Sequence, residues 1–283
     1  MATSSDPIDT YAGQVRDDLL PVLACPVCAE PLARVGTQAG CGNGHRFDEA
    51  RQGHLTLLPA KRRALTADTP EMVDARLRFL GRGHYGPVER ALAAVVAGET
   101  APGIVLDVGS GPGTYLAHAL DAADSRLGLA LDLSPVAIRR AARIHERAGA
   151  VVGDVTERLP VVDGAAAVLL DVFAPRNQHE YRRVLHPDGV LVVVTPRPGH
   201  LAELAAATIS VDPEKERRLH DSLTPAFTLQ TSEDLTWSMD LTAEDVHDVV
   251  HMGPSHHHVD PSTTFEPATV TAAVTVSAWT PTR

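Results

Sequence analysis

A glycine-rich turn in the middle of the chain is the segment best suited to hold a ligand. It reads Leu-Asp-Val-Gly-Ser-Gly-Pro-Gly over residues 106–113 and follows a short apolar run. A buried strand, a glycine turn and a helix starting near Thr114 let a nucleotide-like cofactor approach bare backbone, because glycine has no side chain in the way. A dinucleotide fingerprint requires G-x-G-x-x-G, whereas Gly109, Gly111 and Gly113 run G-x-G-x-G. The spacing therefore favours a different cofactor.

Two more acids follow the turn, and each ends an apolar run. Asp132 closes the run 127–132, where a carboxylate can accept two hydrogen bonds from a ribose diol. Asp154 closes the run 150–154. An acid at Asp107, two positions before the first glycine, followed by G-x-G-x-G, resembles motif I of S-adenosylmethionine (SAM) methyltransferases. That resemblance implies that Asp154 lies near the adenine amino group.

A second set of reactive side chains lies near the N-terminus. Cys25 and Cys28 form one Cys-x-x-Cys knuckle, and Cys41 and His45 form another after twelve intervening residues. Two such knuckles bring four ligands into a tetrahedron, the geometry of structural zinc. All 3 cysteines of the chain are used here, which argues against a disulfide framework. The pattern predicts one structural zinc ion, since four protein ligands leave no open position for catalysis.

The elements that must position these residues can be read from the apolar periodicity. Strands alternate with helical segments, which predicts a doubly wound parallel sheet with its ligand at the carboxyl ends of the strands. Ser134 and Pro135 predict a helix start, as N-cap and first helical residue. Two long alternating runs predict an antiparallel hairpin at the end of the sheet. The expected strands are 103–106, 127–132, 150–154, 165–170 and 190–194, the expected hairpin is 228–241 with 268–279, and the expected helices lie within 71–97, interrupted at 81–86, and over 114–123.

The chain thus divides into three predicted parts. Residues 1–24 are expected to be an N-terminal tail or short helix, 25–62 a small zinc-binding domain, and 63–283 the α/β domain. Phe47 and the run 55–58 are expected to supply the zinc domain's core. Such a core is too small to fold without metal.

Charge is distributed unevenly over the 283 residues. The net charge is −11, which is unfavourable for binding nucleic acid through the whole surface. The segment 25–63 is nevertheless basic, because it contains six cationic residues and only three acids, Glu30, Asp48 and Glu49. The candidate RNA-binding residues are Arg34, Arg46, Arg51, Lys61, Arg62 and Arg63. No stretch reaches transmembrane length and the polar start lacks a signal peptide's apolar core, so a cytoplasmic protein without membrane contact is expected.

The motifs together resemble one family, the bacterial 23S rRNA guanine-N1 methyltransferases of the RlmA type, and most of all their actinomycete macrolide-resistance branch. The resemblance covers about residues 24–283 and is most specific in its N-terminal half. Pro112 departs from it, because family members often have Glu there. The matching residues are Cys25, Cys28, Cys41, His45, Phe47, Asp48, Arg76, Phe79, Leu80, Gly83, His84, Tyr85, Thr195, Pro196, His200, Leu201, Glu203 and Leu204.

The resemblance implies a Rossmann-like SAM-dependent methyltransferase sheet with a small N-terminal zinc-binding domain for RNA recognition. It also implies that Tyr85 and His200 contact SAM. The residues predicted to bind SAM are Tyr85, Asp107, Gly109, Gly111, Gly113, Thr114, Tyr115, Leu116, Asp132, Asp154 and His200.

The implied reaction is methyl transfer from SAM to N1 of a guanine in a 23S rRNA hairpin loop, with macrolide resistance as its outcome. Guanine N1 carries a proton, and Asp171, after the fourth strand, is the candidate general base. Tyr85, Tyr115 and Phe173 are candidates to pack on the cofactor or on a base turned out of its stack. Two alternatives stay open, namely a SAM enzyme acting on tRNA or a small molecule and a non-catalytic RNA-binding module. A homodimer is left open too.

Overall fold

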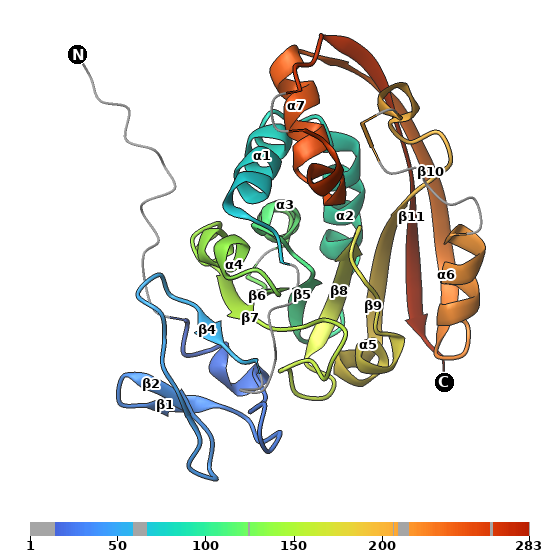
Figure 1. Cartoon of the computed structure of the whole chain (residues 1–283). Coiled ribbons are helices and arrows are strands. Elements are labelled where there is room, and N and C mark those ends of the chain that lie inside the picture. The colour runs from blue at the N-terminus through green and yellow to red at the C-terminus, as the bar shows by residue number, and fades with distance from the viewer. Residues whose placement is uncertain are drawn as a thin grey trace.

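A single eight-stranded sheet forms the body of the protein (Figure 1). The computed structural model describes residues 15–58, 67–123, 125–205, 207–208, 215–260 and 263–282. Along the sheet the strand order is β10-β11-β9-β8-β5-β6-β7-β4. These strands are β4 (Leu55–Thr56), β5 (Ile104–Val108), β6 (Gly128–Asp132), β7 (Ala148–Val152), β8 (Ala166–Val172), β9 (Leu185–Pro196), β10 (Phe227–Leu241) and β11 (Ala268–Pro281).

Strand direction confirms the predicted doubly wound arrangement. β4, β7, β6, β5, β8 and β9 are parallel, and β11 and β10 continue the sheet as the predicted antiparallel hairpin. The chain runs outward from β5 through β6 to β7 and then returns to β8 on the other side of β5. A switch of this kind opens a crevice at the carboxyl ends of the central strands, where α/β proteins bind their ligands.

Helices cover both faces of the sheet. Apolar residues of α2, α3, α4 and α7 pack in one core, and those of α5 and α6 pack in the other. Figure 1 shows α1 and α7, far apart in sequence, lying side by side above the carboxyl ends of the strands. The helices are α1 (Pro70–Gly81), α2 (Gly86–Gly98), α3 (Thr114–Asp121), α4 (Pro135–Ala141), α5 (Gln178–Val184), α6 (Lys215–Leu223) and α7 (Ala243–His251).

Local sequence signals fix where these helices begin. The predicted N-cap of α4 is confirmed, because the Ser134 side chain accepts a hydrogen bond from the Ala137 backbone and Pro135 follows it. α1 begins the same way, with the Thr69 side chain accepting from Met72. α7 begins with a capping box between Thr242 and Asp245. Each cap satisfies backbone donors that the first turn leaves unpaired.

The zinc-binding segment is less separate than its sequence suggests. It contains a three-stranded sheet of β1 (Ala33–Val35), β2 (Gln38–Gly40) and β3 (Arg46–Phe47). Leu55 and Leu57 of the run 55–58 do share a core with the ribbon residues Leu32 and Ala39, but this core extends into the main sheet. β4 pairs in parallel with β7, so that Leu55 lies opposite Val151 at the edge of the main sheet. An edge strand gains backbone hydrogen bonds by pairing, and Leu55 is fully buried there.

The segment before Cys25 is packed where the structure describes it. Leu19, Leu20 and Leu23 are buried in the same core as Leu129 and Val151 of the sheet. Residues 20–22 form a short 3₁₀ turn, and Leu23 bridges to Val161. Of the two expectations for this segment, a tail or a short helix, residues 15–24 are closer to the second, because they contain a short helical turn and their apolar side chains cover one face of the sheet. Residues 1–14 lie outside the described residues.

Candidate functional site

The glycine turn opens the crevice at the carboxyl end of β5. Gly109, Gly111 and Gly113 all adopt positive φ angles, of 67°, 54° and 85°. A Cβ on Gly109 would stand 2.5 Å from the Cβ of Ala174, so neither its conformation nor its surroundings tolerate a larger residue. The turn leads directly into α3 at Thr114, whose hydroxyl is buried and has no hydrogen-bond partner among the described protein groups. The loop thus presents backbone and an unsatisfied polar atom to a ligand.

The predicted acids meet at one edge of the sheet, in the order Asp154, Asp132, Asp107 and Asp171 from β7 to β8. Asp132 holds the turn, since its carboxylate accepts hydrogen bonds from the backbone of Gly111 and of Ser134, both at 2.8 Å. Each carboxylate oxygen can accept a second bond, so the group still has capacity for a diol. Asp154 accepts from the backbone and hydroxyl of Thr156 at 2.8 and 2.7 Å.

Asp107 is the most unusual of these acids. It is 1% exposed, and its Oδ2 atom has no hydrogen-bond partner among the described protein groups. Burial raises the pKa of Asp107 well above its usual range, and the nearby charges of Asp132 and Asp171 raise it further. A buried carboxyl without a partner is costly, and a ligand cation would relieve that cost. The carboxylates of this edge therefore fit SAM, because they can accept hydrogen bonds from its ribose diol and balance the charges of its ammonium and sulfonium groups.

Aromatic side chains form the wall beside β5 and β8. Tyr85 lies at the centre, with Phe173 at 6.1 Å and Trp237 at 5.7 Å between ring centroids. His200 donates from Nε2 to the Tyr85 hydroxyl over 3.2 Å, because its Nδ1 accepts from the backbone of Ala273. Burial raises the pKa of Tyr85, so its phenol stays neutral. The structure thus brings together Tyr85 and His200, and their predicted contact with SAM stays a prediction.

Two predicted site residues have other surroundings. Leu116 is fully buried in the core under α3 and lies where a Cβ on Gly128 would meet it, so its side chain does not face the crevice. Asp171 is also fully buried, and its carboxylate accepts from the Tyr181 hydroxyl at 2.9 Å. The contact with Tyr181 occupies Oδ2 of this carboxylate, and its charge also acts on Asp107, so the role of Asp171 as general base stays a prediction.

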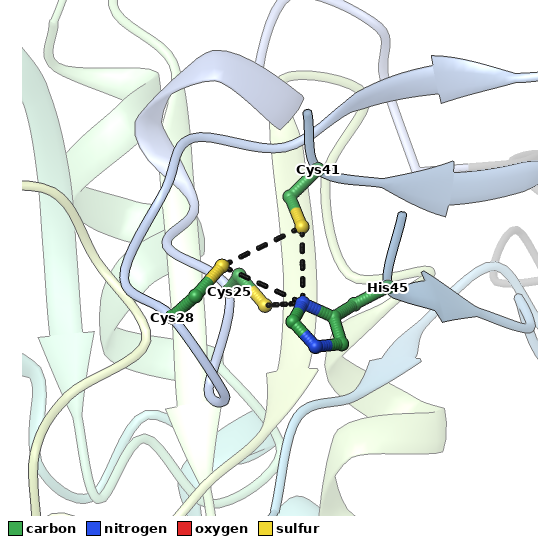
Figure 2. Close-up of side chains that lie close together, drawn as sticks. All are labelled: Cys25, Cys28, Cys41 and His45. Carbon is green, nitrogen blue, oxygen red and sulfur yellow. Dashed lines mark hydrogen bonds between the residues drawn. The ribbon is translucent and has the colours of Figure 1, made fainter. Parts of the chain in front are cut away.

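The predicted zinc ligands converge in the N-terminal segment (Figure 2). His45 Nδ1 lies 3.3 Å from the sulfur of Cys41, 3.5 Å from that of Cys28 and 3.6 Å from that of Cys25. The four ligand atoms all lie within 4.8 Å of one another. Bonds of about 2.0–2.3 Å to a central zinc place tetrahedral ligands at about these separations. The residues therefore fit one structural zinc ion, bound through His45 Nδ1.

Comparison with known proteins decides the family. Residues 23–64 match the family model described as RlmA, N-terminal. The chain is 45% identical, over 93% of its length and 99% of the relative, to a protein of Micromonospora griseorubida named as a 23S rRNA (guanine-N(1)-)-methyltransferase. The chain belongs to the 23S rRNA (guanine-N1)-methyltransferase family. A second family member, the 23S rRNA (guanine(748)-N(1))-methyltransferase of Streptomyces fradiae, is 46% identical over 87% of this chain and 90% of its own length.

Solved structures support the fold alone. A methyltransferase in complex with the Trm112 activator of Haloferax volcanii superposes with a TM-score of 0.52 and 16% identity, over 77% of this chain and all of that chain (100%). The fold prediction for this guanine-N1 methyltransferase family member is confirmed, as are SAM as its cofactor and a zinc ribbon at its N-terminus.

The predicted RNA-binding residues of this family member fall into three groups. Arg34 is paired with Glu49 at 2.7 Å and Asp17 at 2.8 Å, so its charge is already neutralised inside the protein. Arg46 and Arg51 are exposed, although Arg46 also donates to the carbonyl of His45. The run of Lys61, Arg62 and Arg63 lies outside the described residues. Two nearby acids and a backbone carbonyl use the donors of Arg34, and its role in binding RNA stays a prediction.

Sequence reasoning missed Trp237, which packs edge-on against Tyr85 and donates to the carbonyl of His84 at 2.9 Å. It lies on β10, far along the chain, and no local motif marks it. Arg76 was noted only as a family match, yet its guanidinium lies against the glycine turn.

Proposed function

We propose that this protein transfers the methyl group of SAM to N1 of a guanine in a hairpin loop of 23S rRNA. The observation that carries this is the 46% identity, over 87% of the chain, to the Streptomyces fradiae enzyme named for that reaction. The crevice supports it, because an acid-lined edge, a glycine turn and an aromatic wall lie together there. Bound SAM supplies an already activated methyl group, so the protein's work is mainly alignment and exclusion of water.

We assign the cofactor-binding residues from the order of the acids. Asp154 faces the adenine, and Asp132 accepts hydrogen bonds from the ribose hydroxyls. Asp107 faces the cationic groups of the methionine part of SAM. Gly109, Gly111 and Gly113 provide close backbone approach, Thr114 and Tyr115 begin the helix beside them, and the Tyr85–His200 pair lines the far wall. Leu116 supports this site only through its backbone and core packing.

We propose that the ring of Phe173 stacks on the guanine that accepts the methyl group. Its ring is 38% exposed and stacks against His200, with ring centroids 6.2 Å apart at an angle of 29°. Its φ of 57° is a left-handed conformation that is uncommon for an aromatic residue and that holds the ring outward. N1 lies on the Watson–Crick edge, so the guanine must leave its stack, and an exposed ring offers it a new surface. Asp171 is assigned to holding the end of β8.

The zinc-binding segment is the proposed RNA-recognition part. Arg46 and Arg51 are its exposed cations in the described residues, and Lys61, Arg62 and Arg63 follow directly in sequence. Contacts to phosphate from such residues supply affinity without base specificity. The acidic remainder of the chain repels RNA, which confines binding to this surface.

A cytoplasmic location and macrolide resistance belong to the same proposal. Among the described residues, no helix combines the length and apolarity that crossing a bilayer needs. A methyl group on a guanine at the drug-binding tunnel adds bulk and removes a hydrogen-bond donor. Macrolides should then bind less tightly. A homodimer stays a prediction, which sedimentation of the purified protein tests.

Primer extension tests the proposal, because a methyl group on guanine N1 blocks base pairing and stops the polymerase. We expect one new stop in 23S rRNA from cells that express the gene, and none with the inactive variant Asp107→Ala. Incubation with labelled SAM and 23S rRNA, total tRNA or a small-molecule extract identifies the acceptor. Label on tRNA or a small molecule would contradict the rRNA assignment, and no label on any acceptor would indicate a non-catalytic RNA-binding protein.

A further inference from the structure

Arg76 of α1 lies directly against the glycine turn. Its Nη1 atom stands 2.7 Å from where a Cβ on Gly111 would be. The backbone of Gly111 itself donates to Asp132, so the guanidinium lies beside the acid assigned to the ribose. Gly111 therefore leaves room for an arginine as well as for a cofactor.

The arginine is held rigidly from two sides. Nη1 pairs with Asp68 Oδ2 at 2.6 Å, and Nη2 donates to the Met252 carbonyl at 2.5 Å. Met252 is the C-cap of α7, where the helix dipole favours a positive charge. Asp68 is fixed in turn, because its carbonyl accepts from the Ser134 hydroxyl at 2.9 Å. Arg76 thus joins α1, α7 and the start of α4 beside the glycine turn.

Donor capacity remains after these contacts. A guanidinium has five N–H donors, and the contacts to Asp68 and Met252 use two of them. The side chain is 23% exposed, so it is neither sealed in the core nor free in solvent. A partly buried arginine with spare donors is well suited to bind a carboxylate in a forked arrangement.

The charges around Arg76 indicate which group of the ligand it would bind. On the proposed function, adenine and ribose lie over β7 and β6, so the methionine part of SAM lies over β5 and the glycine turn. Asp107 can balance its ammonium. The methionine carboxylate, however, enters an edge already lined by Asp68, Asp107 and Asp132, and it needs a cation there.

We propose that Arg76 binds the methionine carboxylate of SAM and thereby selects cofactors that carry this group. The inference rests on the proposed function and deepens it. The competing explanation is a structural strap, in which Arg76 only ties α1 to α7. The two differ in one respect, since a strap affects all adenosine ligands alike, whereas a carboxylate contact affects only those with a carboxylate.

Calorimetry with SAM and decarboxylated SAM separates these explanations. We expect the wild-type protein to bind SAM more tightly, although decarboxylated SAM has the larger positive charge and the edge is acidic. Arg76→Ala and Arg76→Gln should weaken SAM binding about tenfold to a hundredfold and change binding of decarboxylated SAM by less than about threefold. The unchanged second ligand also shows that the site is still folded.

Arg140→Ala is the matched control. Arg140 on α4 also pairs with an acid of α1, Asp74 at 2.9 Å, but unlike Arg76 it is not among the nearest neighbours of the glycines of the turn. It should leave both affinities unchanged. Equal losses for the two ligands in the Arg76 variants, or equal wild-type affinities, would overturn the inference while leaving the proposed function intact. A wild-type protein that binds neither ligand would overturn both.

Discussion

Asp107 links cofactor binding to proton binding at the scale of a single residue. Its pKa is raised by burial, so it is neutral below that folded-state pKa and charged above it. A cationic ligand favours the charged form. SAM affinity should therefore fall as the pH is lowered through the folded-state pKa, and binding below it should release a proton. Calorimetry in buffers of different ionisation enthalpy measures this release directly.

The variant Asp107→Asn tests the same group. It should bind SAM about tenfold to a hundredfold more weakly and show no proton release. The ligand-free variant should melt at a higher temperature than wild type at neutral pH, because ionising the buried carboxyl costs stability above its unfolded-state pKa. Asp188→Asn, an exposed acid on β9, is the control. Proton release that persists in Asp107→Asn would refute the assignment.

Phe173 carries the second prediction at this scale. Base stacking on an aromatic ring is worth about 1–3 kcal/mol, so Phe173→Ala should lower kcat/KM for rRNA by about fivefold to a hundredfold. SAM affinity should not change, and Phe173→Trp should retain most activity. Phe173→Gly relieves the left-handed strain and should raise Tm while losing the same activity. A loss of SAM affinity in Phe173→Ala would place the ring at the cofactor instead.

At the scale of elements, the glycine turn depends on backbone that only glycine adopts cheaply. Gly109→Ala places a methyl group 2.5 Å from Ala174 at a φ of 67°. The left-handed conformation alone costs about 1–2 kcal/mol, and the contact adds to it. We expect a Tm several degrees lower and SAM binding lost, measured by thermal melting with and without SAM. Gly164→Ala, also at positive φ but in open space, should lower Tm without loss of SAM binding.

The zinc ribbon is the other element whose stability can be tested separately. Zinc binding contributes on the order of 10 kcal/mol to folding of such small sites. Chelation, or Cys28→Ser, should unfold the ribbon and also lower the Tm of the remaining chain, because Leu55 and Leu57 lie in the sheet's core. One zinc per chain by metal analysis is the expected stoichiometry. Purified, unchelated protein without zinc would contradict the assignment.

At the scale of the whole molecule, the ribbon and the methyltransferase sheet share a core. Leu20, Leu23 and Leu32 pack with Leu129 and Val161, and β4 completes the sheet beyond β7. We therefore expect a fragment that begins at residue 63, the predicted domain boundary, to expose this face and to aggregate or melt far below the full chain. A fragment with cooperative melting and full SAM affinity would show that the predicted domains are independent after all.

Much of the site follows from the sequence alone. The glycine spacing, the acids at strand ends and the two metal-binding knuckles are local patterns, because the turn, the strand end and the tetrahedral site each involve a few neighbouring residues. The same holds for the N-cap at Ser134 and the central parallel strands, whose apolar runs are bounded by polar turns.

The tertiary structure decided what depends on distant segments. β4 joined the sheet because an edge strand needs a partner, which no local pattern specifies. Arg34 pairs with Asp17 and Glu49, and Asp171 accepts a hydrogen bond from Tyr181, contacts that no local pattern specifies. Arg76 lies against Gly111 and donates to the Met252 carbonyl only because α1 and α7 pack together. Residue type and spacing thus set which chemistry is available, whereas packing of remote elements set which side chains are free to perform it.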